Sequence, residues 1–158
     1  MYDEIIKKWS KIYGIDEKLI RAIIQTESSW KVYAFRREPK FWNRYWVNIK
    51  NLFAVTPEKD EQWLSSPDIV SSSYGLMQLM LTTAMELGFR YEYPFELFDP
   101  ATNIKWGCAL LKKLYDRYGD WQDAVSAYNQ GNNRKNLDGT YKNQKYVETV
   151  LTYWTEEG

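Results

Sequence analysis

Apolar side chains recur at intervals of three and four residues along most of the chain, which is the period of one face of an α-helix. The pattern predicts a first helix that Asp3 caps and Gly14 ends, and a second helix that Asp16 caps. The apolar stripe of the first helix is Ile5, Ile6, Trp9, Ile12 and Tyr13. In the second helix Glu27 follows Ile23 by one turn, so we expect its carboxyl group on the buried face.

The second half of the chain has the same period. A helix is predicted over 75–88, with an apolar face of Leu76, Met80, Ala84 and Leu87. A long helix is predicted over 99–119, because its opening Asp-Pro pair is a typical cap and first helical position. Asp120 caps a short helix, and the polar stretch 129–143 predicts a loop. The last helix carries Tyr146, Val147, Val150, Leu151 and Trp154 at helical spacing.

Residues 31–70 interrupt this rhythm and are rich in aromatic side chains: Tyr33, Phe35, Phe41, Trp42, Tyr45, Trp46, Phe53 and Trp63. For this insertion we expect short helices, or a small hairpin near 47–55. No repeat, linker or low-complexity tract divides the chain. We therefore predict a single all-α domain over residues 1–158.

The composition excludes several classes of function. The 21 Lys and Arg residues balance 21 Asp and Glu residues without forming a basic stripe, so we expect no nucleic-acid partner. There is no histidine, which excludes Ser-His-Asp catalysis and His-ligated zinc. The single cysteine, Cys108, cannot form an intrachain disulfide and lies on an apolar stripe. We expect no metal and no cofactor, and acid–base chemistry falls to Asp, Glu, Lys or Tyr.

Aromatic residues make up 17% of the chain, and surplus Trp and Tyr suit stacking on sugar rings. The N-terminus has no basic region followed by an apolar run, so we expect no signal peptide. No apolar stretch reaches membrane-spanning length, so we expect no membrane insertion. The neutral net charge favours a monomer.

Glu27 is the residue with the strongest physical case for chemistry. A carboxylate on an apolar helix face is costly when ionised, and desolvation raises its pKa. Such a group can donate a proton near neutral pH. The alternative is that Arg21 or another cation pairs with Glu27, or that Glu27 lies in water beyond the helix end.

Four short motifs occur in order, each at the edge of a predicted helix: Glu27-Ser28, Gly75-Leu76-Met77-Gln78, Ala127-Tyr128-Asn129-Gln130-Gly131 and Tyr146-Val147. Each alone is weak, but together they are specific. In this order they closely resemble the soluble lytic transglycosylase domain of glycoside hydrolase family 23, in the lysozyme-like superfamily. The resemblance covers the chain from about residue 10 onward, except for the insertion.

The resemblance implies an all-α, lysozyme-like domain with a substrate cleft. It also implies cleavage of the β-1,4 bond between N-acetylmuramic acid and N-acetylglucosamine in peptidoglycan glycan strands. Glu27 matches the catalytic glutamate, which protonates the glycosidic oxygen and then takes a proton from the C6 hydroxyl of the same muramic residue. This closes a 1,6-anhydro ring, and an internal nucleophile replaces the second carboxylate of ordinary glycosidases.

The resemblance further implies residues that bind the substrate. Tyr128 and Tyr146 match tyrosines whose hydroxyls lie around the glutamate and the scissile sugar. Met77 and Gln78 match residues that line the sugar subsites.

Three more residues are expected near the sugar. Gly75 would let the backbone approach it closely. Asn129 matches a residue that more often holds the loop through a side-chain to backbone bond. Ser73 is a candidate for orienting Glu27 or the acetamido group, whereas Ser28 is expected to be structural.

The sequence departs from the family pattern in two places. Residues 31–70 separate motifs that lie much closer together in typical members, and we expect this insertion to form a wall or lid of the cleft. Its aromatic residues are candidate sugar platforms, or Trp42 and Trp46 pack the insertion onto the core. After Gly131, Asn132-Asn133 replaces the familiar Pro-Gly.

A hydrolytic goose-type lysozyme is the nearest alternative, since it is similar around the glutamate and the Gly-Leu-Met-Gln run. Such enzymes position water with aspartates, which would fall at Met80 and Ile69 here, with Asp68 as a neighbour that could substitute. The residue at Met80 favours the transglycosylase. A catalytically inactive wall-binding module is the other alternative. In each case we expect action at the bacterial cell wall, for a protein of bacterial or phage origin.

Overall fold

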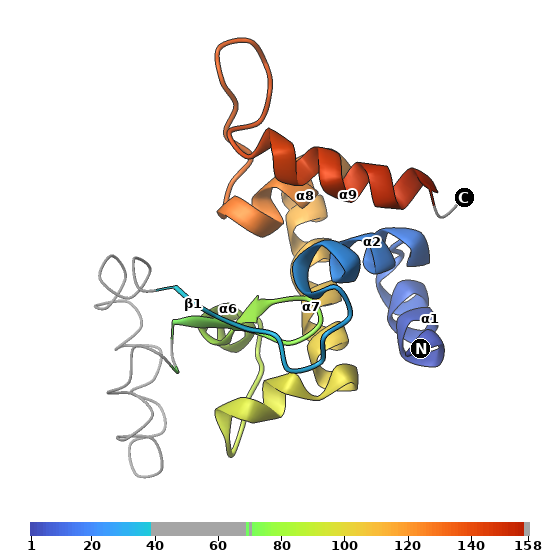
Figure 1. The fold of residues 1–158 in the computed structure, drawn as a ribbon, viewed down its shortest axis with the longest axis vertical. Coiled ribbons are helices and arrows are strands. Elements are labelled where there is room, and N and C mark those ends of the chain that lie inside the picture. The colour runs from blue at the N-terminus through green and yellow to red at the C-terminus, as the bar shows by residue number, and fades with distance from the viewer. Residues whose placement is uncertain (39–68, 70, 157–158) are drawn as a thin grey trace.

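The computed structural model describes residues 1–38, 69 and 71–156 (Figure 1). This part of the chain is mainly helical, with one small antiparallel sheet in the order β1-β2-β3. The elements are α1 (Asp3–Tyr13), α2 (Glu17–Ser28), β1 (Phe35–Arg37), β2 (Ser72–Tyr74), β3 (Leu79–Met80), α6 (Leu81–Glu86), the 3₁₀ helix η1 (Pro94–Phe98), α7 (Pro100–Tyr118), α8 (Trp121–Gln130) and α9 (Gln144–Glu156). The predicted helical fold is confirmed, with a small sheet that was not predicted.

Helix α7 lies in the middle of the molecule (Figure 1) and contributes side chains to two hydrophobic clusters. The larger cluster joins α1, α2, α8 and α9 to one side of α7 and includes the predicted core residue Cys108. The smaller cluster joins β2, β3, α6 and η1 to Trp106 and Leu110 of α7. Because both clusters use α7, this helix fixes the two sides of the molecule relative to each other.

Three of the four predicted helix caps are confirmed. The side chains of Asp16, Asp99 and Asp120 each accept a backbone N–H of the first turn at 2.9 Å. The fourth prediction is wrong: Tyr2 occupies the cap position of α1, and Asp3 instead accepts a 2.6 Å ion-pair hydrogen bond from Arg21. The predicted stripe of α1 is also too wide, because Ile12 is 57% exposed.

The helix predicted over 75–88 is wrong in its first half. A turn follows β2 there and leads into β3, which pairs back onto β2 with Met80 opposite Ser73, and α6 begins only at Leu81. Gly75 and Gln78 have φ angles of 74° and 48° in the connecting turn, which a right-handed helix excludes.

A buried side chain of α7 stabilises this turn. Asn103 donates through Nδ2 to the carbonyls of Tyr74 and Leu97, at 2.7 and 2.9 Å, and accepts the N–H of Met77 at 2.8 Å. It thereby satisfies backbone groups that a continuing helix would have paired internally. The apolar spacing was misleading because these side chains fill two clusters instead of one helix face.

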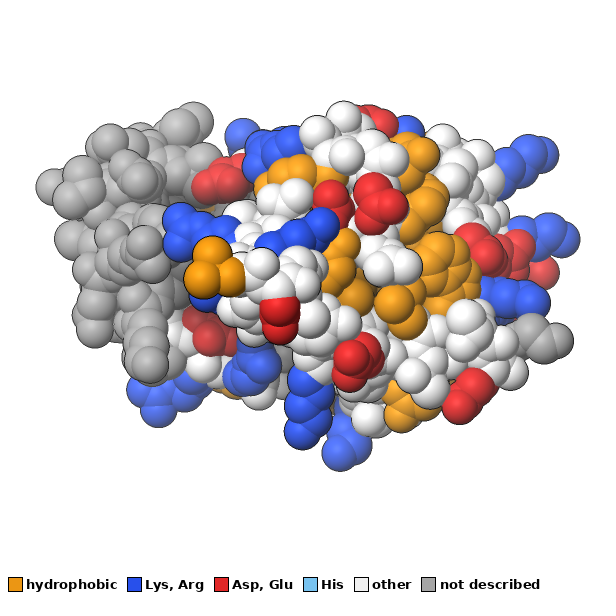
Figure 2. Space-filling view, turned by 90° about the horizontal axis from the view of Figure 1, so that it is seen from above, with side chains coloured by type: hydrophobic (Ala, Val, Ile, Leu, Met, Phe, Trp, Pro, Cys, Tyr) orange, Lys and Arg blue, Asp and Glu red, His pale blue; other side chains and the backbone are white. Residues whose placement is uncertain are grey.

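Over the face of the molecule seen from above, Lys and Arg side chains are interspersed with Asp and Glu side chains (Figure 2). No helix in the described ranges is both long enough and apolar enough to cross a bilayer. The expected short helices, the hairpin near 47–55 and Trp42 and Trp46 lie outside the described residues.

We expect Gly75→Ala to destabilise the fold by more than about 2 kcal/mol, from left-handed strain and crowding together. An added Cβ would lie 2.7 Å from Nδ2 of Asn103. Gly139→Ala is a matched control, because its φ is 87° but no atom lies within 4 Å of the added Cβ. It should lose only about 1 kcal/mol. Urea unfolding followed by tryptophan fluorescence measures both, and equal losses would contradict the crowding.

Candidate active site

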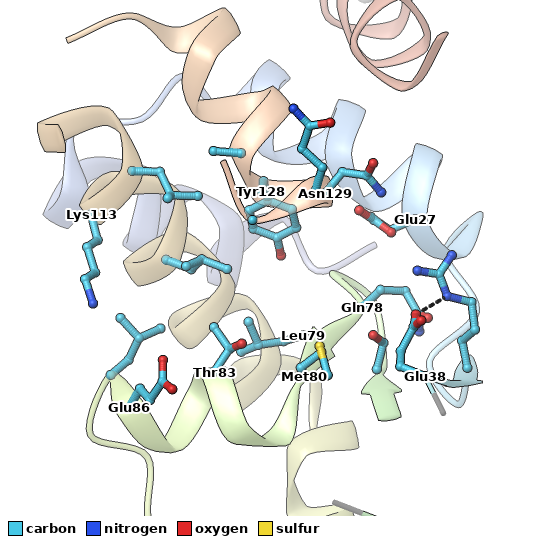
Figure 3. A pocket seen from close by; sticks show the side chains of 18 of the residues that line it. Glu27, Glu38, Gln78, Leu79, Met80, Thr83, Glu86, Lys113, Tyr128 and Asn129 are labelled. Carbon is cyan, nitrogen blue, oxygen red and sulfur yellow. Dashed lines mark hydrogen bonds and ion pairs between the residues drawn. The ribbon is translucent and has the colours of Figure 1, made fainter. Parts of the chain in front are cut away.

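A cavity of about 450 Å³ lies between the two hydrophobic clusters (Figure 3). Its walls come from the end of α2, from β1, β2 and β3, from α6, from one side of α7 and from the end of α8. Glu27 and Glu38 lie on one side of this cavity in Figure 3, and Lys113 and Glu86 lie on the other. The cavity therefore extends well beyond the surroundings of a single carboxylate.

Glu27 lies in the last turn of α2 and remains partly accessible in the cavity. The hydroxyl of Tyr146 donates a 2.6 Å hydrogen bond to its Oε1 atom. Burial raises the pKa of Glu27 from 4.5 to about 7, although the hydrogen bond from Tyr146 and the positive charge of Arg36 act to lower it. Arg21 pairs with Asp3 and not with Glu27. The buried face predicted for this carboxyl group is therefore observed.

Tyr146 reaches Glu27 because α9 packs along α2. The start of α9 is fixed by Asn143, whose carbonyl accepts the N–H of Tyr146 at 3.0 Å. The Asn143 side chain donates to the Ser126 carbonyl and to Oδ1 of Asn129, both at 3.0 Å, and accepts from the Ser126 hydroxyl at 2.7 Å. Sequence reasoning missed Asn143 and Ser126, since only the fold brings these polar groups together.

Tyr128 approaches the same region from α8, and its hydroxyl donates to the carbonyl of Met77 at 2.7 Å. Burial, and next the charge of Glu27, raise the pKa of Tyr128 and of Tyr146 well above their usual value. Both tyrosines therefore keep their protons and act as hydrogen-bond donors. Figure 3 shows Tyr128 and Asn129 beside Glu27 at the cavity wall.

One face of the sheet brings the expected Ser73 together with two charged residues, Arg36 and Glu38, that sequence reasoning missed. Arg36 of β1 is opposite Ser73 of β2, and Ser73 is opposite Met80 of β3. All three line the cavity, as does Glu38, which follows two residues after Arg36 and pairs with its Nε at 2.6 Å. Phe35 instead contacts Tyr74 and Phe98.

The residues expected around the sugar fall into two groups in the structure, those at the cavity and those behind it. Ser73, Gln78, Tyr128 and Asn129 line the cavity with Glu27, and Tyr146 contacts Glu27 directly. Gln78 also donates to the carbonyls of Ala34 and Gly75, at 3.0 and 3.1 Å, which fixes its side chain.

Two expected residues do not line the cavity. Met77 is fully buried, with its sulfur against Gly107, and contributes its carbonyl to Tyr128. Gly75 is crowded by Asn103 of α7, so packing within the protein already requires a glycine there. The structure thus places these two residues behind the site. Ser28 is buried and donates to the carbonyl of Ile24, a structural contact.

Besides Glu27, the carboxylates that line the cavity within the described ranges are Glu38 and Glu86. Met80, where the goose-type alternative predicts an aspartate, lines the cavity without a carboxylate. Asp68 lies outside the described residues. Among the residues that the structure describes, no three His, Cys, Asp or Glu side chains are grouped to hold a metal ion.

Comparison with known families decides what this helical domain is. The family model described as the transglycosylase SLT domain matches residues 4–149, which is most of the chain.

The chain belongs to the transglycosylase SLT domain family.

Two relatives agree with this assignment. A transglycosylase of Enterobacteria phage PRD1 is 32% identical over 148 residues, which cover 94% of this chain and 41% of the phage protein. Membrane-bound lytic murein transglycosylase C of Shigella sonnei (strain Ss046) is 32% identical over 144 residues, which cover 82% of this chain and 31% of that protein. This SLT domain therefore spans less than half the length of the curated relatives that it matches.

The resemblance drawn from four short motifs is confirmed at the level of the family. The roles of individual residues of the SLT domain stay predictions, and two variants test the electrostatics of Glu27.

At pH 8 we expect Glu27→Gln to be more stable than the wild type by roughly 1–3 kcal/mol, since one pKa unit corresponds to about 1.4 kcal/mol. The pKa of Glu27 is about 7 in the fold against an ordinary glutamate value of 4.5, so ionisation destabilises the folded state only as pH rises between these values. The gain should therefore be absent below pH 4.5 and complete above about pH 7.5. Urea unfolding at several pH values measures it, with Glu148→Gln as the surface control. A gain that does not depend on pH would contradict the assignment.

Tyr146→Phe should raise the pKa of Glu27 further above about 7, because it removes the hydroxyl that favours the ionised carboxylate. A hydrogen bond to a charged group contributes roughly 1.5–3 kcal/mol, so a pKa rise of roughly one to two units is expected. Titration of ¹³C-labelled glutamate carboxyl groups by NMR measures it. Tyr153→Phe, also on α9, is the matched control and should leave the titration unchanged.

Proposed function

We propose that this SLT domain is a peptidoglycan lytic transglycosylase, with Glu27 as both acid and base. The observation that carries the proposal is a carboxyl group with a pKa of about 7 that faces a 450 Å³ cavity and accepts a hydrogen bond from Tyr146. The family and the names of the two relatives described above support the activity, and the name of the Shigella sonnei relative supports the murein substrate.

The reaction needs Glu27 in two protonation states. A pKa near 7 keeps a substantial fraction of the group protonated at neutral pH, ready to protonate the glycosidic oxygen. The resulting carboxylate then accepts the proton of the C6 hydroxyl as that oxygen attacks the anomeric carbon and closes the 1,6-anhydro ring. Glu27 ends the cycle protonated. The reaction therefore needs no second carboxylate and consumes no water.

The surroundings of Glu27 support this cycle. Tyr146 donates to the carboxylate and therefore favours its ionised form in the second step. Tyr128, Gln78 and Asn129 present polar groups along the cavity wall that can bind hydroxyl and acetamido groups of the glycan. Met80 provides no carboxylate to position a water molecule, which favours the anhydro product over hydrolysis.

Glycan strands of peptidoglycan are the proposed partner, and the bacterial cell wall is the proposed place of action. The expected monomer, the 31–70 insertion as a wall or lid, and the single domain over residues 1–158 stay predictions.

Digestion of purified peptidoglycan followed by mass analysis of the muropeptides tests the proposal. We expect products that lack one water relative to a reducing end, and a kcat/KM that falls as pH rises through about 7, because the general acid is then ionised. Glu27→Gln should reduce turnover at least about 100-fold while the protein stays folded. Glu148→Gln should be as active as the wild type. Reducing-end products would favour the lysozyme reaction, and an active Glu27→Gln would overturn the role of Glu27.

A further inference from the structure

Strand β1 brings a charged pair to the side of the cavity where Glu27 lies. Arg36 and Glu38 are two residues apart, so both side chains project from the same face of the extended chain. Both line the cavity together with Glu27. Figure 3 shows Glu38 and its dashed ion pair on the side of Glu27, away from Lys113 and Glu86.

Two contacts hold this pair in place. The backbone N–H of Glu38 donates to the carbonyl of Ser71 at 2.8 Å and extends the pairing of β1 with β2. The Arg36 Nε atom donates to Oε1 of Glu38 at 2.6 Å. The Glu38 side chain is 30% exposed and the Arg36 side chain 61% exposed. Glu38 is therefore the anchored partner, and part of the Arg36 guanidinium remains open to the cavity.

The charged and titratable groups around Glu27 come from three elements. Tyr146 of α9 and Tyr128 of α8 are neutral donors, and the ionic groups are Arg36 and Glu38. Among the described residues, Arg36 is the cation whose charge acts on Glu27, and its effect on the pKa exceeds the opposite effect of Glu38. The pair as a whole therefore favours the ionised form of Glu27.

We propose that Arg36, held by Glu38, is a positioning residue that stabilises the ionised form of Glu27 between its donation of a proton and the return of a proton. This inference rests on the proposed function, because only a reaction that uses Glu27 twice needs that intermediate charge. An unpaired arginine would favour the carboxylate throughout and weaken Glu27 as an acid. Glu38 offsets part of that effect. The pair therefore balances the strength of Glu27 as an acid in the first step against the stability of its carboxylate before the second step.

The test compares pH profiles of kcat/KM on soluble, uncrosslinked glycan strands. Arg36→Gln should move the basic limb to higher pH by roughly half a unit or more and lower the maximum about three- to ten-fold. Glu38→Gln should move the basic limb to lower pH. Arg36→Lys should restore most of the wild-type profile, because it keeps the charge.

Arg37→Gln is the matched control, since it removes the same charge at the neighbouring position of β1, outside the cavity lining. It should leave the profile unchanged. NMR titration of ¹³C-labelled glutamate carboxyl groups gives a readout independent of activity, with the Glu27 signal identified by its absence in Glu27→Gln. The titration midpoint of Glu27 should move to higher pH in Arg36→Gln and to lower pH in Glu38→Gln.

Shifts of Arg36→Gln and Glu38→Gln in the same direction, or a change in KM alone, would overturn the inference. An unshifted profile together with an inactive Glu27→Gln would overturn this inference and leave the proposed function intact. An active Glu27→Gln would overturn the proposed function itself.

Discussion

The hydrogen bond between Tyr146 and Glu27 joins two residues that are 119 positions apart in the sequence. It closes the contact between α2 and α9 at the point where an acidic group is removed from water. Removal from water makes ionisation unfavourable, and a single donor in a protein interior recovers only part of that free energy. A carboxyl group poised near neutrality is the result, and the surrounding elements are arranged so that it remains in contact with a cavity.

Two asparagines, the buried Asn103 and the half-buried Asn143, hold the elements that surround this carboxyl group. Asn143 joins the end of α8 to the start of α9, and Asn103 joins α7 to the turn between β2 and β3 and to η1. An amide side chain can do this because it carries both donors and an acceptor at one position. Neither residue needs to contact the substrate. Their hydrogen bonds instead hold backbone segments from which Tyr128, Tyr146 and Gln78 project.

The sequence predicted those features that depend on nearby residues. The caps at Asp16, Asp99 and Asp120 and the buried face that carries Glu27 follow from local spacing, and ordered motifs were enough to indicate the family. The turn at Gly75 was predicted as helix because its shape is decided by Asn103, which lies far along the chain. Arg36 and Glu38 were missed for a similar reason, since β1 is a strand only by pairing with residues beyond the insertion. Met77 shows that a shared motif does not tell which way a side chain points.

The way in which the chain leaves and re-enters the small sheet has a consequence for how such domains can diversify. The polypeptide departs after Glu38 and is back beside it at Ser71, because these two residues are joined by a backbone hydrogen bond. The anchor points of the intervening segment are therefore fixed by the pairing of β1 with β2. Since the entropy of closing a loop grows only slowly with its length, segments of very different size can be exchanged between such anchors at small cost to stability. Evolution or engineering can thus alter what borders the cavity while Glu27, Tyr146 and the helices behind them stay the same.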